Sequence, residues 1–462
     1  MRRNSRQLAF DWGAAGAAQP SPGEGLEACA APSRPAALAP AAGLMEQVVA
    51  AENMRRALRQ VKSNKGSGGV DGMTVRELEG HLRQHWPRLR QQLLDGTYQP
   101  QPVRRVDIPK PGGGVRQLGI PTVLDRLIQQ ACLQVLSPLY EPTFSPHSYG
   151  FRPGKSAHQA LAAAREHVAA GHTWVVDLDL EKFFDRVNHD VLMGKLAKRL
   201  GDRRVLRLIR RYLQAGVMLQ GVVMERHEGT PQGGPLSPLL ANILLHDLDQ
   251  ELERRGHRFS RYADDCNIYV RSQRAGERVM GSVRRFLERK LRLRVNEEKS
   301  AVARPWERKF LGYRVTTRKG EGVLRIAASS LKRAKDTIRA LTKRNRGVSA
   351  ERMLRELATF TNGWVAYFWQ ARTPSVFQHL DEWTRRRVRC FIWKQWKKPR
   401  HRAQELLKAG IGPWLAWGTA CDGPSLWRAA GSPALTQSLT NARLKQLGYH
   451  SLHERYLALA AE

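Results

Sequence analysis

Two short acidic segments carry the residue types best suited to metal-assisted chemistry. The first is a Tyr-x-Asp-Asp pattern at Tyr262–Asp265, where a turn is expected between two short apolar strands. The adjacent carboxylates of Asp264 and Asp265 are costly in such a place unless cations neutralise them. Taken alone, the pattern fits a solvated acidic hairpin turn as well as it fits a metal site.

The second segment places acids at the end of an apolar stretch, Trp174–Leu180, that predicts a buried strand. Residues two apart in a strand share a face, so Asp177 and Asp179 point the same way, and either one can meet Asp264. Asp185 better fits a cap at the junction between this strand and a helix. Two converging acidic strand ends supply oxygen ligands for two Mg²⁺ ions, for which Mn²⁺ can substitute. Such a site supports phosphoryl transfer from a nucleoside triphosphate to a primer 3′-hydroxyl.

The elements that must position these acids mix strands with helices. Alternation and turn residues predict a strand at 103–108, a hairpin tip at 109–114, and a hairpin at 259–270 that carries the acids at its turn. Apolar periodicity and helix-start residues predict helices at 45–61, 125–139 and 236–252. Beyond residue 325 the predicted strands stop, and amphipathic helices follow at 330–344, 349–370 and 374–398.

The charge of the chain indicates nucleic acid as a partner. Lys and Arg number 77 against 42 Asp and Glu, which gives a net charge of +35. A charge this large opposes a compact fold unless an anion neutralises it, and the alternative is a merely solvated basic surface. Residues 301–462 hold 31 basic and 11 acidic residues, a surplus of 20. In the third predicted helix, the basic residues that lie largely off the apolar stripe are candidates for RNA contacts: Arg385, Arg386, Arg389 and Lys397.

Other features exclude several classes of protein. The five cysteines are scattered without the two-residue spacing of a zinc site, so neither a metal knuckle nor a disulfide framework is predicted. No apolar run approaches the roughly 20 residues of a membrane span, so no membrane partner is expected. The N-terminus carries Arg2 and Arg3, but polar residues and prolines interrupt any signal-peptide core. A cytoplasmic protein is therefore expected.

The chain resembles the reverse transcriptases encoded by bacterial group II introns, of the short type that lacks an endonuclease domain. The resemblance runs from about Met45 to the C-terminus and follows the family's order of motifs. The segments that carry it are Ile108–Pro121, Ser148–Ser156, Asp179–Asp190, Gly229–Pro238, Asn296–Ser300, Phe310–Tyr313 and Thr361–Phe368. No cysteine pair or histidine cluster follows the helical block, so no DNA endonuclease is expected.

The resemblance implies an α+β fold: a right-handed polymerase with fingers and an antiparallel palm sheet, followed by an all-α thumb and maturase domain. Composition predicts a disordered leader rich in Ala and Pro at 1–44. The remaining predicted parts are an N-terminal helical extension of the fingers at 45–99, fingers and palm at 100–315, the helical thumb and maturase domain at 316–400, and a short C-terminal maturase and DNA-binding tail at 401–462.

The resemblance also assigns roles to single residues. Asp179 lies five residues before the aromatic Phe184, as the family's metal-binding aspartate does, so Asp179, Asp264 and Asp265 are the expected catalytic metal ligands. Phe184 is expected to exclude a 2′-hydroxyl. The expected nucleotide-binding residues are Lys110, Arg116, Phe184, Gln232 and Lys299, and the expected primer grip is Phe310, Leu311, Gly312 and Tyr313. The alternatives are a stabilised basic hairpin for Lys110 and Arg116, and a plain surface side chain for Lys299.

The implied activity is RNA-directed DNA polymerisation with dNTPs, an RNA template and a DNA primer. The implied partners are a group II intron RNA, whose splicing and retrohoming the protein assists, and a target DNA. One alternative is a domesticated relative that acts in defence, CRISPR adaptation or DNA repair; another is an RNA-binding splicing factor that no longer polymerises. A viral RNA-dependent RNA polymerase fits less well. The implied location is the bacterial cytoplasm, with the nucleoid as the site of integration; the oligomeric state is not indicated.

Overall fold

The computed structural model describes residues 43–109, 114–219, 222–224, 228–229, 233–422 and 425–461. Two compact units divide the chain. The first unit runs to Ala163 and resumes at His172–Ala303; the second holds Ala164–Gly171 and Arg304 onward. The first 42 residues of the predicted leader lie outside the description. The five-part division at 44, 99, 315 and 400 remains a prediction.

The first unit begins with helices whose apolar residues recur every three or four positions. In α2, the residues Met54, Ala57, Leu58 and Val61 form one buried face. The single helix predicted at 45–61 is instead two, because Ala50 adopts ψ 138° and interrupts the helical turn. The helices of this unit are α1 (Leu44–Val49), α2 (Ala51–Ser63), α3 (Leu78–Leu94), α4 (Val123–Tyr140), α6 (His189–Ala197), α7 (Arg203–Gln214), α8 (Ser237–Arg254) and α9 (Gln273–Phe286). Helix α5 (Ala157–Ala169) begins in the first unit and ends in the second.

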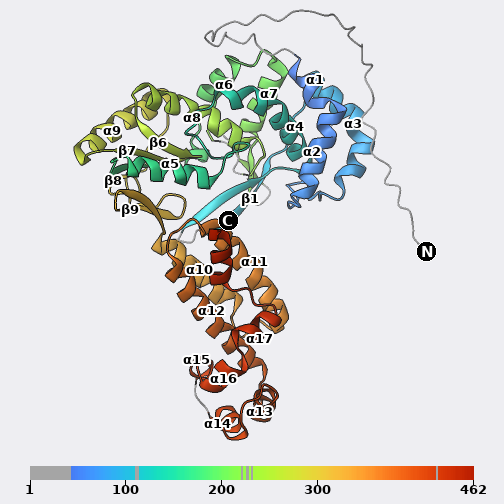
Figure 1. Cartoon of the computed structure of the whole chain (residues 1–462). Helices are drawn as coiled ribbons and strands as arrows, with labels where there is room; N and C mark the ends of the chain where they lie inside the picture. Colours follow the sequence, from blue (N-terminus) through green and yellow to red (C-terminus); the bar gives the residue numbers. More distant parts are fainter. Residues whose placement is uncertain are drawn as a thin grey trace, which may run out of the picture. The chain divides into compact units, whose positions relative to one another are not determined.

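The described residues of the first unit form an antiparallel four-stranded sheet in the order β6-β7-β3-β8, of which β6, β7 and β8 are labelled in Figure 1. Its strands are β6 (Arg258–Tyr262), β7 (Asp265–Val270), β3 (Trp174–Asp179) and β8 (Ala301–Ala303). Side chains of these strands, among them Val176 and Ile268, join the buried core together with α8 and α9. This is the predicted palm sheet, and the hairpin predicted at 259–270 is its β6–β7 pair.

A second sheet of the first unit has the order β2-β1-β4-β5, in which β1 and β4 run parallel. Its strands are β1 (Val103–Pro109), β2 (Val115–Ile120), β4 (Val217–Leu219) and β5 (Val222–Met224). β1 and β2 form the hairpin predicted at this place, but its tip at 110–113 lies outside the described residues. Short helical turns occupy Glu141–Thr143, Phe183–Asp185 and Leu287–Leu291.

The second unit opens with one hairpin, β9 (Tyr313–Arg318) and β10 (Glu321–Ile326), and is helical afterwards. The three predicted helices are present as α10 (Ala328–Leu341), α11 (Ala350–Phe368) and α12 (Pro374–Gln395). The later helices are α13 (Pro399–Lys408), α14 (Pro413–Cys421), α15 (Leu426–Ala429), α16 (Pro433–Ser438), α17 (Asn441–Gln446) and α18 (Leu452–Ala461). The last of them packs on α12, where the Tyr456 ring stacks on Phe377 at 4.1 Å.

The α+β class, with a polymerase palm followed by a helical domain, is confirmed. Among the described helices, none combines the length and the apolar character that crossing a membrane requires.

Candidate active site

The palm sheet brings the two acidic segments together. Asp179 is the last residue of β3 and Asp265 is the first residue of β7, and the two are direct partners across the antiparallel pair. Side chains directly opposite each other in such a pair have Cβ atoms about 4.5–5.5 Å apart. Asp264 precedes Asp265 in the two-residue loop between β6 and β7. The three predicted ligands therefore cluster where the adjacent strands β3 and β7 end and begin.

The segment Asn296–Ser300 holds the backbone of Asp179 in place. The Asp179 N–H donates to Ser300 Oγ at 3.0 Å, and the Asp179 carbonyl accepts from the Asn296 N–H at 2.8 Å. The Lys299 ammonium lies 3.6 Å from Asp179 Oδ2. Sequence reasoning singled out Lys299 but missed Ser300, whose role depends on a contact across 121 positions of the chain.

The structure separates the two aspartates that strand alternation alone left equivalent. Asp177 is buried, with 8% of its surface exposed, and lies between Asn267 of β7 and Ala301 of β8. The Asp179 side chain is 38% exposed at the open end of the strand. Of this pair, Asp179 therefore has the side chain that is more open to a substrate, and its role as a metal ligand stays a prediction.

The donor set suits a hard divalent cation that shares its ligands with a substrate. Among the described residues, no group of three or more His, Cys, Asp or Glu side chains is already arranged to enclose a metal ion. Mg²⁺ does not need such a cage, because it is usually bound through one or two carboxylates together with water and substrate phosphates. The facing carboxylates of Asp179 and Asp265, with Asp264 beside them, fit that mode of binding.

A cavity of about 480 Å³ in the first unit has the dimensions of a nucleotide site. Phe184 lines it together with Phe151, Gly233 and Gly234. Its neighbour Phe183 is instead buried in the core, with 2% exposure. Sequence reasoning gave Phe151 no role of its own, although it lies in a quoted motif.

Three other predicted nucleotide-binding residues fall on undescribed parts of the chain. Lys110 and Gln232 lie outside the described residues, and so does the side chain of Arg116. The segment that contains Gln232 is anchored at its start, where the Gly229 N–H donates to the Val187 carbonyl at 2.8 Å. The roles of Lys110, Arg116 and Gln232 stay predictions.

The predicted primer grip forms a tight turn in the second unit. Phe310 and Tyr313 exchange backbone hydrogen bonds of 2.9 Å in both directions. Between them, Leu311 and Gly312 have φ values of 50° and 85°, a conformation that glycine adopts readily. The Tyr367 hydroxyl donates to the Leu311 carbonyl at 2.8 Å, so α11 supports the turn.

Three of the four basic residues predicted to contact RNA have partners within the second unit. Arg385 pairs with Asp381, and Arg389 donates to the Leu439 carbonyl. Arg386 donates to the Trp427 carbonyl and lies 4.5 Å from the centre of the Trp427 ring. Lys397 is exposed. Arg386 and Arg389 thus connect α12 to later segments, whereas Arg385 bonds within α12. Only part of the hydrogen-bonding capacity of these arginines is therefore open to RNA.

Comparisons with known proteins agree with this geometry. Residues 108–315 match the family described as reverse transcriptase (RNA-dependent DNA polymerase), and residues 331–410 match the group II intron, maturase-specific domain. Protein YkfC of Escherichia coli (strain K12) is 33% identical over 328 residues, which cover 62% of this chain and 86% of YkfC. Group II intron-encoded protein LtrA of Lactococcus lactis subsp. cremoris is 30% identical over 335 residues, which cover 58% of this chain and 56% of LtrA.

Among solved structures, a partial Cas6-RT-Cas1–Cas2 complex is similar over 54% of this chain and 43% of that chain, at 28% identity and a TM-score of 0.35. Telomerase from Candida albicans is similar over 66% of this chain and 63% of that chain, at 14% identity and a TM-score of 0.39.

The facing acids and the domain matches first define a class: the protein is a polymerase of the reverse transcriptase type. The chain belongs to the group II intron-encoded reverse transcriptases, because a polymerase domain and a maturase-specific domain follow one another in it. It spans about half the length of LtrA, with 56% of that protein covered. The predicted family, fold class and enzyme class are confirmed, and the assignment of single site residues stays a prediction.

Proposed function

We propose that this protein adds dNTPs to a primer 3′-hydroxyl on an RNA template, and that it binds a group II intron RNA to assist splicing and retrohoming. The observation that carries the polymerase function is the direct pairing of Asp179 with Asp265 at the end of the palm strands. The aromatic cavity in the same unit, lined by Phe151 and Phe184, provides room for the incoming nucleotide.

The residues of the chain divide the work of phosphoryl transfer. Asp179, Asp264 and Asp265 supply the oxygen ligands for two Mg²⁺ ions. When bound, these ions activate the 3′-hydroxyl and neutralise charge on the triphosphate and on the leaving pyrophosphate. Lys299, beside Asp179, adds a positive charge near the leaving group. Phe184 fills the space that a ribose 2′-hydroxyl needs and so selects dNTPs.

The nucleotide and the nucleic acids are held by residues around this centre. Lys110 and Arg116 bind triphosphate oxygens, Gln232 bonds the nucleotide, and Phe310–Tyr313 supports the primer. The net charge of +35 suits a large polyanion such as intron RNA, with the target DNA as a second partner. We place the activity in the bacterial cytoplasm, and on the nucleoid during integration.

Primer extension on an RNA template with Mg²⁺ tests the polymerase function. Asp264→Ala is expected to lower cDNA synthesis at least about 1,000-fold, because a metal ligand is lost. Asp190→Ala is the matched control, since this aspartate has a 79% exposed side chain in an ion pair with Arg210. Asp264→Ala activity equal to that of the wild type would show that the acid site is wrongly assigned.

The maturase function has a separate readout. The Asp264→Ala protein should still bind the intron RNA and promote its splicing, because the acidic site is not needed to hold a folded RNA. Loss of splicing together with cDNA synthesis would contradict this division of labour. Intron RNA domains flanking the gene favour the intron role, whereas a defence operon favours the domesticated alternative.

A further inference from the structure

The residue that precedes the Tyr-x-Asp-Asp pattern, Arg261, is fully buried together with the Asp249 carboxylate of α8. Arg261 Nε donates to Asp249 Oδ1 at 2.6 Å, and Nη2 donates to Oδ2 at 2.5 Å. Burial opposes a charge on the guanidinium, but the Asp249 carboxylate outweighs this effect and raises the pKa of Arg261. The core of the first unit therefore contains a charged pair directly beside the acidic turn, Tyr262–Asp265.

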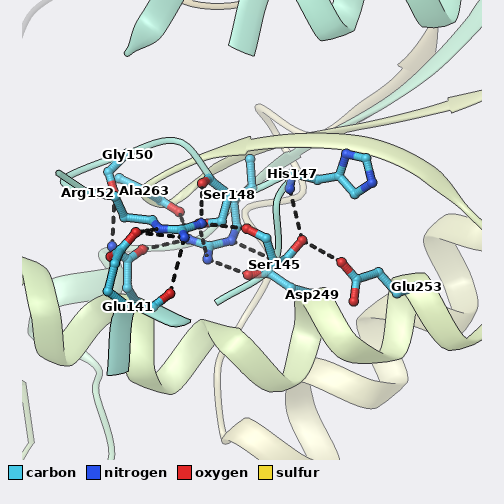
Figure 2. Close-up of polar contacts among 11 residues, drawn as sticks. Glu141, Ser145, His147, Ser148, Gly150, Arg152, Asp249, Glu253 and Ala263 are labelled. Carbon is cyan, nitrogen blue, oxygen red and sulfur yellow. Dashed lines mark hydrogen bonds and ion pairs between the residues drawn. The ribbon is translucent and has the colours of Figure 1, made fainter. Parts of the chain in front are cut away.

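The remaining donors of Arg261 reach three further groups, two of which belong to Ser148 and Ala263, labelled in Figure 2. Nη1 donates to Asn242 Oδ1 at 3.0 Å and to the Ala263 carbonyl at 2.9 Å. Nη2 also donates to Ser148 Oγ at 2.7 Å. Together with the bonds to Asp249, these contacts use all five N–H donors of a guanidinium. A lysine ammonium keeps the charge but cannot reproduce this planar fork.

The same contacts fasten the loop before Arg152 to the acidic turn. The Tyr149 N–H donates to the Arg261 carbonyl at 2.8 Å. Asn242, which accepts from Arg261, donates through Nδ2 to the Gly150 carbonyl at 2.9 Å. A Cβ atom on Gly150 would collide with the backbone nitrogen of Ala263. The loop and the turn therefore touch backbone to backbone.

Both segments contain a non-glycine residue in the left-handed region. Ala263 has φ 59° and lies directly before Asp264, and Phe151 has φ 58°. Such conformations are uncommon and persist only where the surrounding structure holds them, which is typical of functional sites. Phe151 is 54% exposed and lines the nucleotide cavity with Phe184. One buried network thus holds the backbone of a metal-binding turn and a wall of the cavity.

We propose that Arg261 is a positioning residue of the active site, whose five hydrogen bonds keep the acidic turn and the Phe151 wall in one fixed arrangement. This inference rests on the proposed polymerase function. Arg261 acts through Ala263 and the loop, and it contacts no substrate. A buried ion pair is not in general needed for stability, since well-packed apolar residues can replace it without loss. Precise placement of metal ligands is needed, because small displacements are costly for catalysis.

Arg261→Lys tests the proposal by keeping the charge opposite Asp249 while removing the fork. We expect kcat for single-nucleotide incorporation to fall about 30-fold and the Mg²⁺ midpoint of activity to rise several-fold, because the ligands are displaced. The Kd for primer–template is expected to stay within about twofold of wild type, because no binding contact is lost. A residue that served structure alone would not shift the Mg²⁺ midpoint.

Arg204→Lys is the matched control, because its guanidinium also bonds to carboxylates, those of Asp202 and Glu46, away from the acidic turn. Its kcat and Mg²⁺ midpoint should equal those of the wild type. Thermal unfolding of each variant separates loss of placement from loss of folding.

A folded Arg261→Lys protein with wild-type kcat and Mg²⁺ midpoint would overturn the proposal. If Arg261→Lys does not fold, Ser148→Ala decides, since it removes a single acceptor of the network. A fall of about fivefold in its kcat supports the positioning role, and an unchanged kcat overturns it. If the wild type makes no cDNA, the polymerase function fails and this inference with it. If the wild type makes cDNA and the Arg261 and Ser148 variants match its kcat and Mg²⁺ midpoint, this inference fails while the polymerase function stands.

Discussion

The two units each bury an aspartate, and they satisfy its charge in different ways. In the first unit, Asp249 is fully buried against an equally buried cation, Arg261. In the second unit, Asp381 is 1% exposed and accepts from the Tyr449 hydroxyl at 2.7 Å and the Leu452 N–H at 2.8 Å. Its cationic partner, Arg385, keeps 18% of its side chain exposed.

This difference follows from what each acid holds. Asp249 fixes one guanidinium that branches toward a turn and a loop, whereas Asp381 gathers the start of α18 onto α12. A third buried acid, Asp125 at the start of α4, has no cation among its hydrogen-bond partners in the described part of the chain; it accepts from the hydroxyls of Thr122 and Tyr98. The three buried aspartates thus form a series that substitutions can test: Asp249 has a buried cation, Asp381 has a cation and neutral donors, and Asp125 has neutral donors.

The largest effect is expected at the cation pair. Arg261→Met leaves the Asp249 carboxylate buried without a counter-charge, which should lower the free energy of unfolding by about 3–5 kcal/mol. Chemical unfolding measures this change when it is monitored by hydrogen exchange in peptides from α8 and β6 of the first unit. Arg261→Met combined with Asp249→Leu removes both charges and should recover much of the loss. No recovery would mean that the polar network, and not the charge, dominates the stability of this region.

A somewhat smaller loss is expected in the second unit. Asp381→Ala leaves the Tyr449 hydroxyl and the Leu452 N–H without their acceptor, whereas Arg385 can still reach water. The free energy of unfolding should therefore fall by about 2–3 kcal/mol. Hydrogen exchange should rise first in peptides from α18, which the carboxylate holds. Asp381→Asn is the control, since the amide oxygen can still accept from the backbone of Leu452. Equal exchange in α18 of the Ala variant and the wild type would remove Asp381 from this role.

The neutral-partner site predicts a pH dependence. Burial raises the pKa of Asp125 to about 6, although hydrogen bonds from Thr122 and Tyr98 oppose the shift. The folded state then binds a proton more tightly than the unfolded state, where an aspartate has a pKa near 4. Stability from this group is complete below pH about 4 and is lost as the pH rises through about 6, by roughly 2–3 kcal/mol.

Asp125→Asn should remove that fall. Urea unfolding at several pH values between about 4 and 7 gives the free energy of unfolding of the wild type and of the variant. Contributions from the other titrating groups cancel in the difference between the two. A difference that does not change with pH would show that the Asp125 carboxyl is ionised normally in the fold.

The smallest effect is expected where an arginine covers an aromatic ring. Arg386 lies over the Trp427 ring and donates to the Trp427 carbonyl. Arg386→Leu should therefore lower the free energy of unfolding of the second unit by about 1 kcal/mol. Arg355→Leu, at a site 73% exposed, is the control and should change stability little. Fluorescence-detected unfolding is suitable, because most tryptophans of the chain lie beyond Arg304. If Arg386→Leu lowered the free energy of unfolding as much as Asp381→Ala, buried and surface charges would contribute equally to stability, contrary to this comparison.

Much of this architecture could be predicted from local sequence. An apolar stretch located β3, apolar residues around a turn located the β6–β7 hairpin, and the spacing to Phe184 supplied the choice of Asp179 over Asp177. The break at Ala50 gave no signal, since alanine favours the helix interior. The sequence analysis gave Asp249 no role, because its partner Arg261 lies on another element and no local pattern pairs the two. Phe151 and Ser300 depend on contacts distant in the chain, which no local pattern encodes.

The hold of Ser300 on Asp179 has a consequence for synthesis of the protein. The ribosome makes Asp179 long before it makes Asp265 and Ser300, which fix the aspartate at the end of its strand. A nascent chain that is released before Ser300 therefore carries the aspartates without the frame that aligns them. Translation itself delays assembly of the polymerising centre until the whole palm has left the exit tunnel, so truncated products are expected to be inert.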